Sequence, residues 1–189
     1  GQLSDASIKH LDVRSVYDLD GQMMNWIIPP LPIQAVNNRW YLRDANWLAS
    51  FPETSQRLSV MYEQEGGETP DLIMAVTPDL FIDLLNKTGP ITLPRYKVTI
   101  SAANFIEQIQ TTTSIAYDKN LNQPKQLLAD LYPILLQKIG QDATGMLGLL
   151  QIMQNNLSQK NILIYSRDPE LQRSLSDFHW SGEISKTDK

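Results

Sequence analysis

The chain has 189 residues, of which 42% are hydrophobic, 20% are charged and 8% are aromatic, a composition typical of a water-soluble globular protein of one domain. The absence of cysteine excludes a thiol nucleophile, a disulfide framework and a Cys-ligated zinc or iron–sulfur site. Because a nucleic-acid partner requires a basic face that neutralises phosphates, the net charge of −5 leads us to expect no nucleic-acid binding.

The predicted elements of the first half are strands and helices in alternation. In chain order they are a strand over residues 8–19, an extended connection from Pro29 to about Asn38, a helix that starts at Ser50–Glu53 and stops at Gly66-Gly67, a short buried strand over residues 71–76, and a helix that Thr77 caps and Gly89-Pro90 ends.

The second half repeats this alternation with longer helices. A strand over residues 97–100 precedes a helix that Ser101 caps and that buries Phe105, Ile106 and Ile109. The next helix, which Pro133 kinks or splits, buries Leu127, Leu128, Leu131, Leu135 and Ile139, and the helix after it buries Met146, Leu150, Met153 and Leu157. A strand over residues 161–165 then leads to a helix that begins at Asp168-Pro169-Glu170 and buries Leu171 and Leu175.

Strands separated by helical stretches favour an α/β fold, which we expect as a layered α-β-α domain with a mixed central sheet. We expect one domain over residues 1–182 and a frayed polar tail over residues 183–189. The sequence contains no run of about 18 apolar residues, so it predicts no membrane-spanning helix. Because Gly1 stands where an initiator methionine would be, the ends of the chain do not fix its localisation.

The sequence contains none of the common catalytic motifs. It has no G-x-G-x-x-G, no Walker A loop, no H-E-x-x-H and no G-x-S-x-G, so nucleotide, zinc-protease and serine-hydrolase interpretations lack their signatures. The only histidines, His10 and His179, have no candidate partner that a motif places beside them. A histidine-based catalytic triad is therefore not expected.

The segment from Asn37 to Pro52 is the strongest candidate for a site. It holds the guanidinium groups of Arg39 and Arg43, the carboxylate of Asp44, several asparagines and two tryptophans, just before a predicted helix start. Guanidinium groups and helix-start amides both donate several hydrogen bonds to a phosphate or carboxylate, so the segment predicts an anion site. The open alternative is structural, with the tryptophan rings in the core and the Arg–Asp pair locking the fold.

Within this segment, Arg43-Asp44-Ala45-Asn46-Trp47 followed by Phe51-Pro52 resembles a family of bacterial domains of unknown function that is recognisable by R-D-A-N-W and F-P. The resemblance extends over nearly the whole chain, through Tyr62-Glu63-Gln64, residues 71–76 with Pro78, Thr88-Gly89-Pro90, residues 101–105 and 162–165, Glu170-Leu171-Gln172 and Trp180-Ser181-Gly182. This sequence has Ala49-Ser50 where the family pattern often has an acidic residue before F-P, which removes one possible metal ligand.

That family is distantly similar to the LytR-CpsA-Psr enzymes, which transfer lipid-linked glycopolymers to the bacterial cell wall. The resemblance implies an extracytoplasmic domain, membrane-anchored in the full-length protein, with an anionic lipid-linked glycan as its partner. It implies that Arg43 grips a polyprenyl pyrophosphate and that Asp44 helps to hold magnesium. Asn46 lies in the same motif, and Arg39, Arg57 and Arg95 are additional candidates for substrate binding.

Three hypotheses for the function follow from these observations. In the first, the domain is a phosphotransferase-like enzyme in which Arg43 stabilises developing charge and Asp44 holds a cation or orients Arg43. In the second, it is a non-catalytic module that binds a cell-envelope glycan, lipid or protein in the same cleft. In the third, the R-D-A-N-W segment only stabilises a scaffold. They differ in whether Arg43 and Asp44 line an open cleft.

Overall fold

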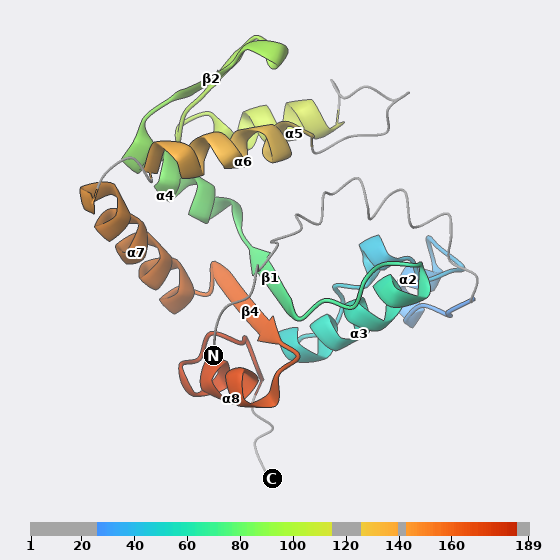
Figure 1. Ribbon diagram of the computed structural model, residues 1–189. Helices are drawn as coiled ribbons and strands as arrows, with labels where there is room; N and C mark the ends of the chain where they lie inside the picture. Colours follow the sequence, from blue (N-terminus) through green and yellow to red (C-terminus); the bar gives the residue numbers. More distant parts are fainter. Residues whose placement is uncertain (1–25, 115–125, 140–142, 185–189) are drawn as a thin grey trace.

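The computed structural model describes residues 26–114, 126–139 and 143–184 (Figure 1). Within them the α-helices are α2 (Leu31–Gln34), α3 (Phe51–Gln64), α4 (Pro78–Thr88), α5 (Phe105–Ser114), α6 (Gln126–Ile139), α7 (Ala143–Ser158) and α8 (Pro169–Asp177). The strands are β1 (Leu72–Val76), β2 (Ile91–Leu93), β3 (Val98–Ile100) and β4 (Ile162–Ser166), and the 3-10 helices are η1 (Leu42–Asp44) and η2 (Pro94–Tyr96). The strand predicted over residues 8–19 lies outside the described residues, as do His10 and most of the predicted C-terminal tail.

The combination of helices and strands confirms the α/β class. Within the described residues, however, β1 pairs with β4 and β2 pairs with β3, both antiparallel, so these four strands form two ribbons where one mixed central sheet was expected. The β2–β3 pair is antiparallel because the short η2 turn joins its strands, whereas a parallel pair needs a long crossover. Figure 1 shows the β1–β4 pair between α3 on one side and α7 on the other.

Two clusters of buried apolar residues hold the described parts of the chain together. The main core contains side chains from α4, α5, α6, α7, the β2–β3 pair and β4: Leu80, Leu84, Leu85, Ile91, Leu93, Ile100, Phe105, Leu127, Leu131, Leu135, Ile139, Leu157 and Ile162. A second and smaller cluster joins α2, η1 and α3 and contains Ile33, Trp40, Leu42, Ala45 and Met61. The segment singled out in the sequence is built on this smaller cluster.

The predicted connection from Pro29 to Asn38 is not extended throughout. It contains α2, because the carbonyl oxygen of Pro30 accepts hydrogen bonds from the amides of Ile33 and Gln34 at 2.9 and 3.1 Å. Pro32 fits this single turn, since a proline in the first turn of a helix forfeits no intrahelical hydrogen bond. The sequence prediction also missed β2, a strand of three residues.

Several apolar side chains predicted to be buried are exposed. They are Leu72, Met74 and Val76 of β1, Ile106 of α5, Met146 and Leu150 of α7, and Leu171 of α8. Each lies in an element that was predicted correctly, but on a side that the main core does not contact. α6 runs unbroken through Pro133, so the helix is not split there.

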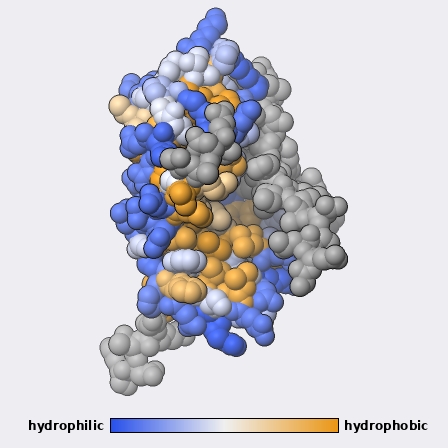
Figure 2. All heavy atoms as spheres, turned by 60° about the vertical axis from the view of Figure 1, so that its left-hand side comes forward, coloured by the Kyte–Doolittle hydropathy of each residue, from blue (hydrophilic) through white to orange (hydrophobic). Residues whose placement is uncertain are grey.

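The side of the molecule that carries α7 in Figure 1 is turned forward in Figure 2, which shows hydrophobic residues gathered in a large patch there. Among the helices in the described part of the chain, none is both long and apolar enough to span a bilayer.

Candidate functional site

The 3-10 turn η1 positions the Arg-Asp pair at the surface. Leu42 and Ala45 point into the smaller cluster, where they are 5% and 0% exposed, and this leaves Arg43 exposed and Asp44 half-buried. The indole nitrogen of the buried Trp40 donates to the carbonyl oxygen of Asp44 at 3.0 Å, and the amide of Trp40 donates to the carbonyl oxygen of Ile27 at 2.9 Å. The backbone that carries Arg43 is therefore fixed by hydrogen bonds to the buried Trp40.

Tyr41 is a common platform for two guanidinium groups. The guanidinium of Arg43 lies 4.2 Å from the centroid of the Tyr41 ring, and that of Arg39 lies 5.9 Å from the same centroid and 5.6 Å from the ring of Trp26. A cation–π contact uses the face of a guanidinium and not the N–H groups at its edge. The Nε of Arg39 is nevertheless buried, whereas the Arg43 side chain is exposed. The two arginines of the predicted site are thus brought together around one aromatic ring.

Arg43 and Asp44 border an open hollow of about 270 Å³, which we call the Arg43 hollow. Its lining residues are Ile33, Val36, Asn37, Arg43, Asp44, Asn46 and Trp47. The side-chain amide of Asn37 donates to the Asp44 carboxylate at 3.4 Å, so Asp44 accepts a hydrogen bond from another lining residue. The hollow combines a guanidinium, amide groups and the half-exposed Trp47 ring, which gives it both donors for an anion and apolar surface.

Arg57 lies in a neighbouring hollow. Its guanidinium is 5.0 Å from the Trp40 ring centroid, and its side chain is exposed on α3. There it lines an open groove of about 680 Å³ with Ile27, Leu48, Glu53, Gln56, Val60, Met61 and Gln64, none of which lines the Arg43 hollow. Arg57 is therefore held on the same small cluster as Arg43 but does not share its hollow.

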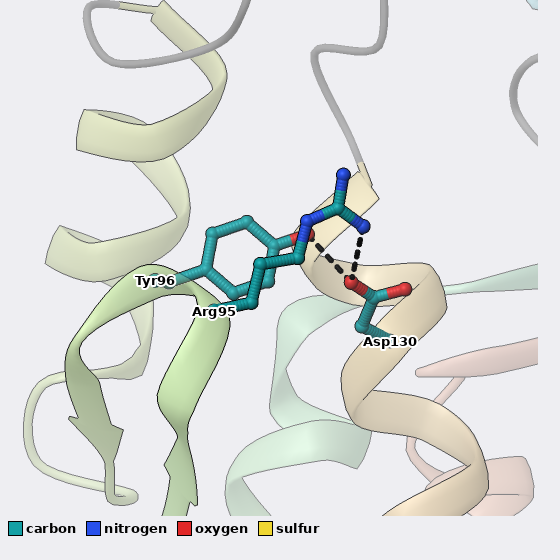
Figure 3. A network of polar contacts seen from close by, with 3 residues as sticks. All are labelled: Arg95, Tyr96 and Asp130. Carbon is teal, nitrogen blue, oxygen red and sulfur yellow. Dashed lines mark hydrogen bonds and ion pairs between the residues drawn. The ribbon is translucent and has the colours of Figure 1, made fainter.

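The structure does not bring Arg95 to this region. Arg95 lies in η2 at the tip of the β2–β3 hairpin, at the end of the molecule away from α2 and α3 (Figure 1). Its guanidinium is 3.3 Å from the Asp130 carboxylate of α6, and the hydroxyl of Tyr96 donates to the same oxygen at 2.7 Å (Figure 3). This contact fastens the hairpin to α6.

The structure does not place the amino end of α3 at the Arg43 hollow. The amide of Phe51, the first residue of α3, donates to the carbonyl oxygen of Gly182 at 3.3 Å, and the side chains of Phe51 and Pro52 are buried. The chain near Gly182 therefore covers the amino end of α3, and no residue of that end lines the Arg43 hollow.

Of the residues that the structure describes, Asp44 is the one carboxylate that lines the Arg43 hollow. Among the described residues there is no group of three His, Cys, Asp or Glu side chains that could hold a metal ion. Magnesium prefers octahedral oxygen coordination and is often held by one or two carboxylates together with water and substrate phosphates. Asp44 would supply the single carboxylate of such a site, and its carboxylate also accepts a hydrogen bond from Asn37.

Sequence reasoning did not single out Asn37, Tyr41 and Trp47 as individual site residues. The signal for Tyr41 is its place midway between Arg39 and Arg43, since alternating residues of an extended segment lie on one side. Asn37 and Trp47 approach Asp44 through the folding of α2 and η1, which the sequence prediction did not contain.

Residues 28–113, from the start of the described region to α5, match the model of a family described as "Protein of unknown function (DUF4012)". The match includes the Arg43 hollow and supports the prediction of a bacterial domain of unknown function. The comparisons with curated proteins and with solved structures found no significant match.

Proposed function

We propose that the Arg43 hollow binds the phosphate or pyrophosphate of a lipid-linked cell-envelope glycopolymer. The observation that carries this proposal is the pair of guanidinium groups around Tyr41, one of which borders a hollow that also contains Asn37 and Asn46. Paired guanidinium groups and amide donors match the several acceptor oxygens of a phosphate. The resemblance to the LytR-CpsA-Psr enzymes adds the extracytoplasmic location, the membrane anchor and the lipid-linked glycan.

The geometry favours binding over transfer as the main activity. Transfer of a phosphate-linked group requires stabilisation of the charge that develops on the phosphoryl oxygens, commonly by arginines together with a metal ion. Arg43 supplies such a charge, and Asp44 is the one acid among the described residues that line the hollow. A domain that binds the lipid-linked glycopolymer without reacting with it needs the arginine charge but no metal ion.

A second candidate function is a scaffold that binds no ligand at this position. The observation in its favour is that Trp40 donates to the backbone carbonyl oxygen of Asp44 and Asn37 donates to the Asp44 carboxylate, so the R-D-A-N-W segment is bonded to the smaller cluster. In that case Asp44 contributes to stability and the exposed Arg43 contributes little.

The binding proposal is tested by titrating the protein with inorganic pyrophosphate and, separately, with a polyprenyl pyrophosphate in detergent micelles, each with and without magnesium. We expect Arg43→Ala to weaken binding by about 10- to 100-fold, because a hydrogen bond to a charged group contributes about 1.5–3 kcal/mol. Arg95→Ala removes the same charge from another exposed arginine at the far end of the molecule, and we expect it to bind like the wild type.

The other outcomes separate the candidates. Absence of binding by the wild type, or equal binding by the wild type and Arg43→Ala, contradicts the binding proposal. If Asp44→Ala then also lowers the free energy of unfolding, the scaffold function is supported. Movement of labelled glycopolymer from its lipid pyrophosphate carrier to added cell-wall acceptor, with release of the lipid phosphate, by the wild type but not by Arg43→Ala would show transfer.

A further inference from the structure

The β1–β4 ribbon has an open edge within the described part of the chain. The register pairs Ile73 with Tyr165 and Ala75 with Leu163, and beyond the strand ends the amide of Thr77 donates to the carbonyl oxygen of Asn161 at 2.8 Å. In an antiparallel ladder the hydrogen-bonded residues alternate.

It follows that the backbone groups of Leu72, Met74 and Val76 point away from β4. The contact of Ile164, the residue opposite Met74, agrees with this, because its amide donates at 2.9 Å to the carbonyl oxygen of Trp180 on the other side of β4. Among the described residues, β4 is the only strand that pairs with β1.

The side chains along this edge are apolar and partly uncovered. Leu72, Met74 and Val76 share one face of the ribbon and are 46%, 46% and 43% exposed. An edge strand without charge, proline or a bulge readily accepts another strand, and natural proteins normally protect or cover such an edge. β1 has none of these protective features.

We propose that the open edge of β1 pairs with the strand segment at residues 8–19 of the same chain. This segment alternates Leu11 and Val13 with Asp12 and Arg14, the pattern of a strand that covers an apolar face on one side and meets water on the other. Paired to β1, its apolar side extends the face formed by Leu72, Met74 and Val76.

A series of neighbouring residues leads from the start of the described chain to the start of β1. Ile27 and Gln64 line the same groove, and Glu63, the neighbour of Gln64 on α3, lies 3.7 Å from Arg167. The amide of Arg167 in turn donates to the carbonyl oxygen of Asp71 at 2.9 Å, directly before β1.

The connecting chain sets how far the segment can reach from Trp26. Residues 20–25 separate Leu19 from Trp26, and six residues span up to about 20 Å when extended. Because the segment belongs to the same chain, it has a high effective concentration at the edge when this linker spans the separation, and it then competes well against a strand from a second molecule.

The test is native-state hydrogen exchange of the full chain, resolved at single amides by NMR. If the segment pairs with β1, the amides of Leu72, Met74 and Val76, which point away from β4, are protected from exchange. Their protection does not depend on protein concentration. We expect the double variant Leu11→Asp/Val13→Asp to speed exchange at these amides by about tenfold or more. The amides of Ile73 and Ala75 face β4 and report whether the ribbon itself stays folded.

The matched control is Asp12→Asn/Arg14→Gln, which changes the opposite side of the segment and should leave all these amides as in the wild type. Unprotected amides at Leu72, Met74 and Val76 in the wild type would overturn the proposal. So would protection that persists in Leu11→Asp/Val13→Asp. Protection that increases with protein concentration, together with a dimer mass in light scattering, would assign the edge to a second copy instead.

Discussion

Arg43 is stacked on Tyr41, with its guanidinium 4.2 Å from the centroid of the phenol ring. The extended backbone of Tyr41, with φ −93° and ψ 156°, turns into η1 at the next residue and brings the two side chains together. A flexible exposed arginine is thereby held at the rim of its hollow before any ligand arrives. Preorganisation of this kind lowers the entropic cost of binding.

The role of Tyr41 can be separated from that of Arg43. We expect Tyr41→Leu to weaken pyrophosphate binding by about two- to fivefold, since an exposed cation–π contact contributes about 0.5–1 kcal/mol. Tyr41→Phe retains the ring and should bind like the wild type. Isothermal titration calorimetry measures both. Equal affinities for Tyr41→Leu and the wild type would show that the stack does not position Arg43 for the ligand.

The Tyr96 hydroxyl should contribute more to stability than the neighbouring ion pair. Tyr96→Phe removes the 2.7 Å hydrogen bond to Asp130 and is expected to lower the free energy of unfolding by about 1 kcal/mol. Arg95→Ala should change it by less than about 0.5 kcal/mol, because the Arg95 side chain is 60% exposed and the ion pair is screened by solvent. Urea denaturation compares the two, and a larger loss for Arg95→Ala would reverse this order.

Asp168 caps α8 and should stabilise it. Its carboxylate accepts hydrogen bonds from the amides of Glu170 and Leu171 at 3.0 and 2.8 Å. We expect Asp168→Ala to cost about 1 kcal/mol in the free energy of unfolding, and Asp168→Asn to cost much less because asparagine is also a good cap. Thermal and urea unfolding provide the measurement. Equal losses in the two variants would mean that the cap hydrogen bonds are not the cause.

Gly182 should not tolerate a larger residue. Its φ is 64°, and a Cβ atom there would lie 2.8 Å from a methyl carbon of Leu163 and 3.3 Å from the Cβ of Phe51. We expect Gly182→Ala to lower the free energy of unfolding by about 1–3 kcal/mol, from backbone strain together with the contact. Unfolding in urea measures the loss, and a change below about 0.5 kcal/mol would contradict it.

Gly148 is the matched comparison and should behave in the opposite way. It lies inside α7, and the three atoms nearest to a new Cβ all belong to the flexible Lys87 side chain, the closest being its Cε at 2.7 Å. Because alanine is the better helix former by about 1 kcal/mol, we expect Gly148→Ala to be neutral or stabilising. A loss as large as that of Gly182→Ala would show that Lys87 cannot move aside.

The elements could be predicted wherever their signals are local. Asp168-Pro169-Glu170 marks the start of α8 because a cap and its first turn are made by neighbouring residues. The apolar run of β1 likewise predicted a strand. Burial was predicted less well, since Met146 of α7 lies on the side of its helix away from the main core, and periodicity does not say which neighbours an element meets.

The candidate site was partly predictable for the same reason. Arg43, Asp44 and Asn46 are close in sequence, and all three line one hollow. Arg95 was a candidate only because of its residue type, and its position depends on how the β2–β3 hairpin packs on α6. The closed amino end of α3 depends on Gly182, more than a hundred residues further along the chain, so no local pattern could have indicated it.

The smaller apolar cluster has a consequence for how the molecule opens. Ile33, Trp40, Leu42, Ala45 and Met61 form it without a member of the main core, so relatively few buried contacts hold the region around Arg43. Regions of this kind open locally at a lower free energy than the whole molecule. A ligand bound at Arg43 would therefore slow local opening of this region first. The indole emission, to which Trp40 and Trp47 of this region contribute, would change before global melting begins.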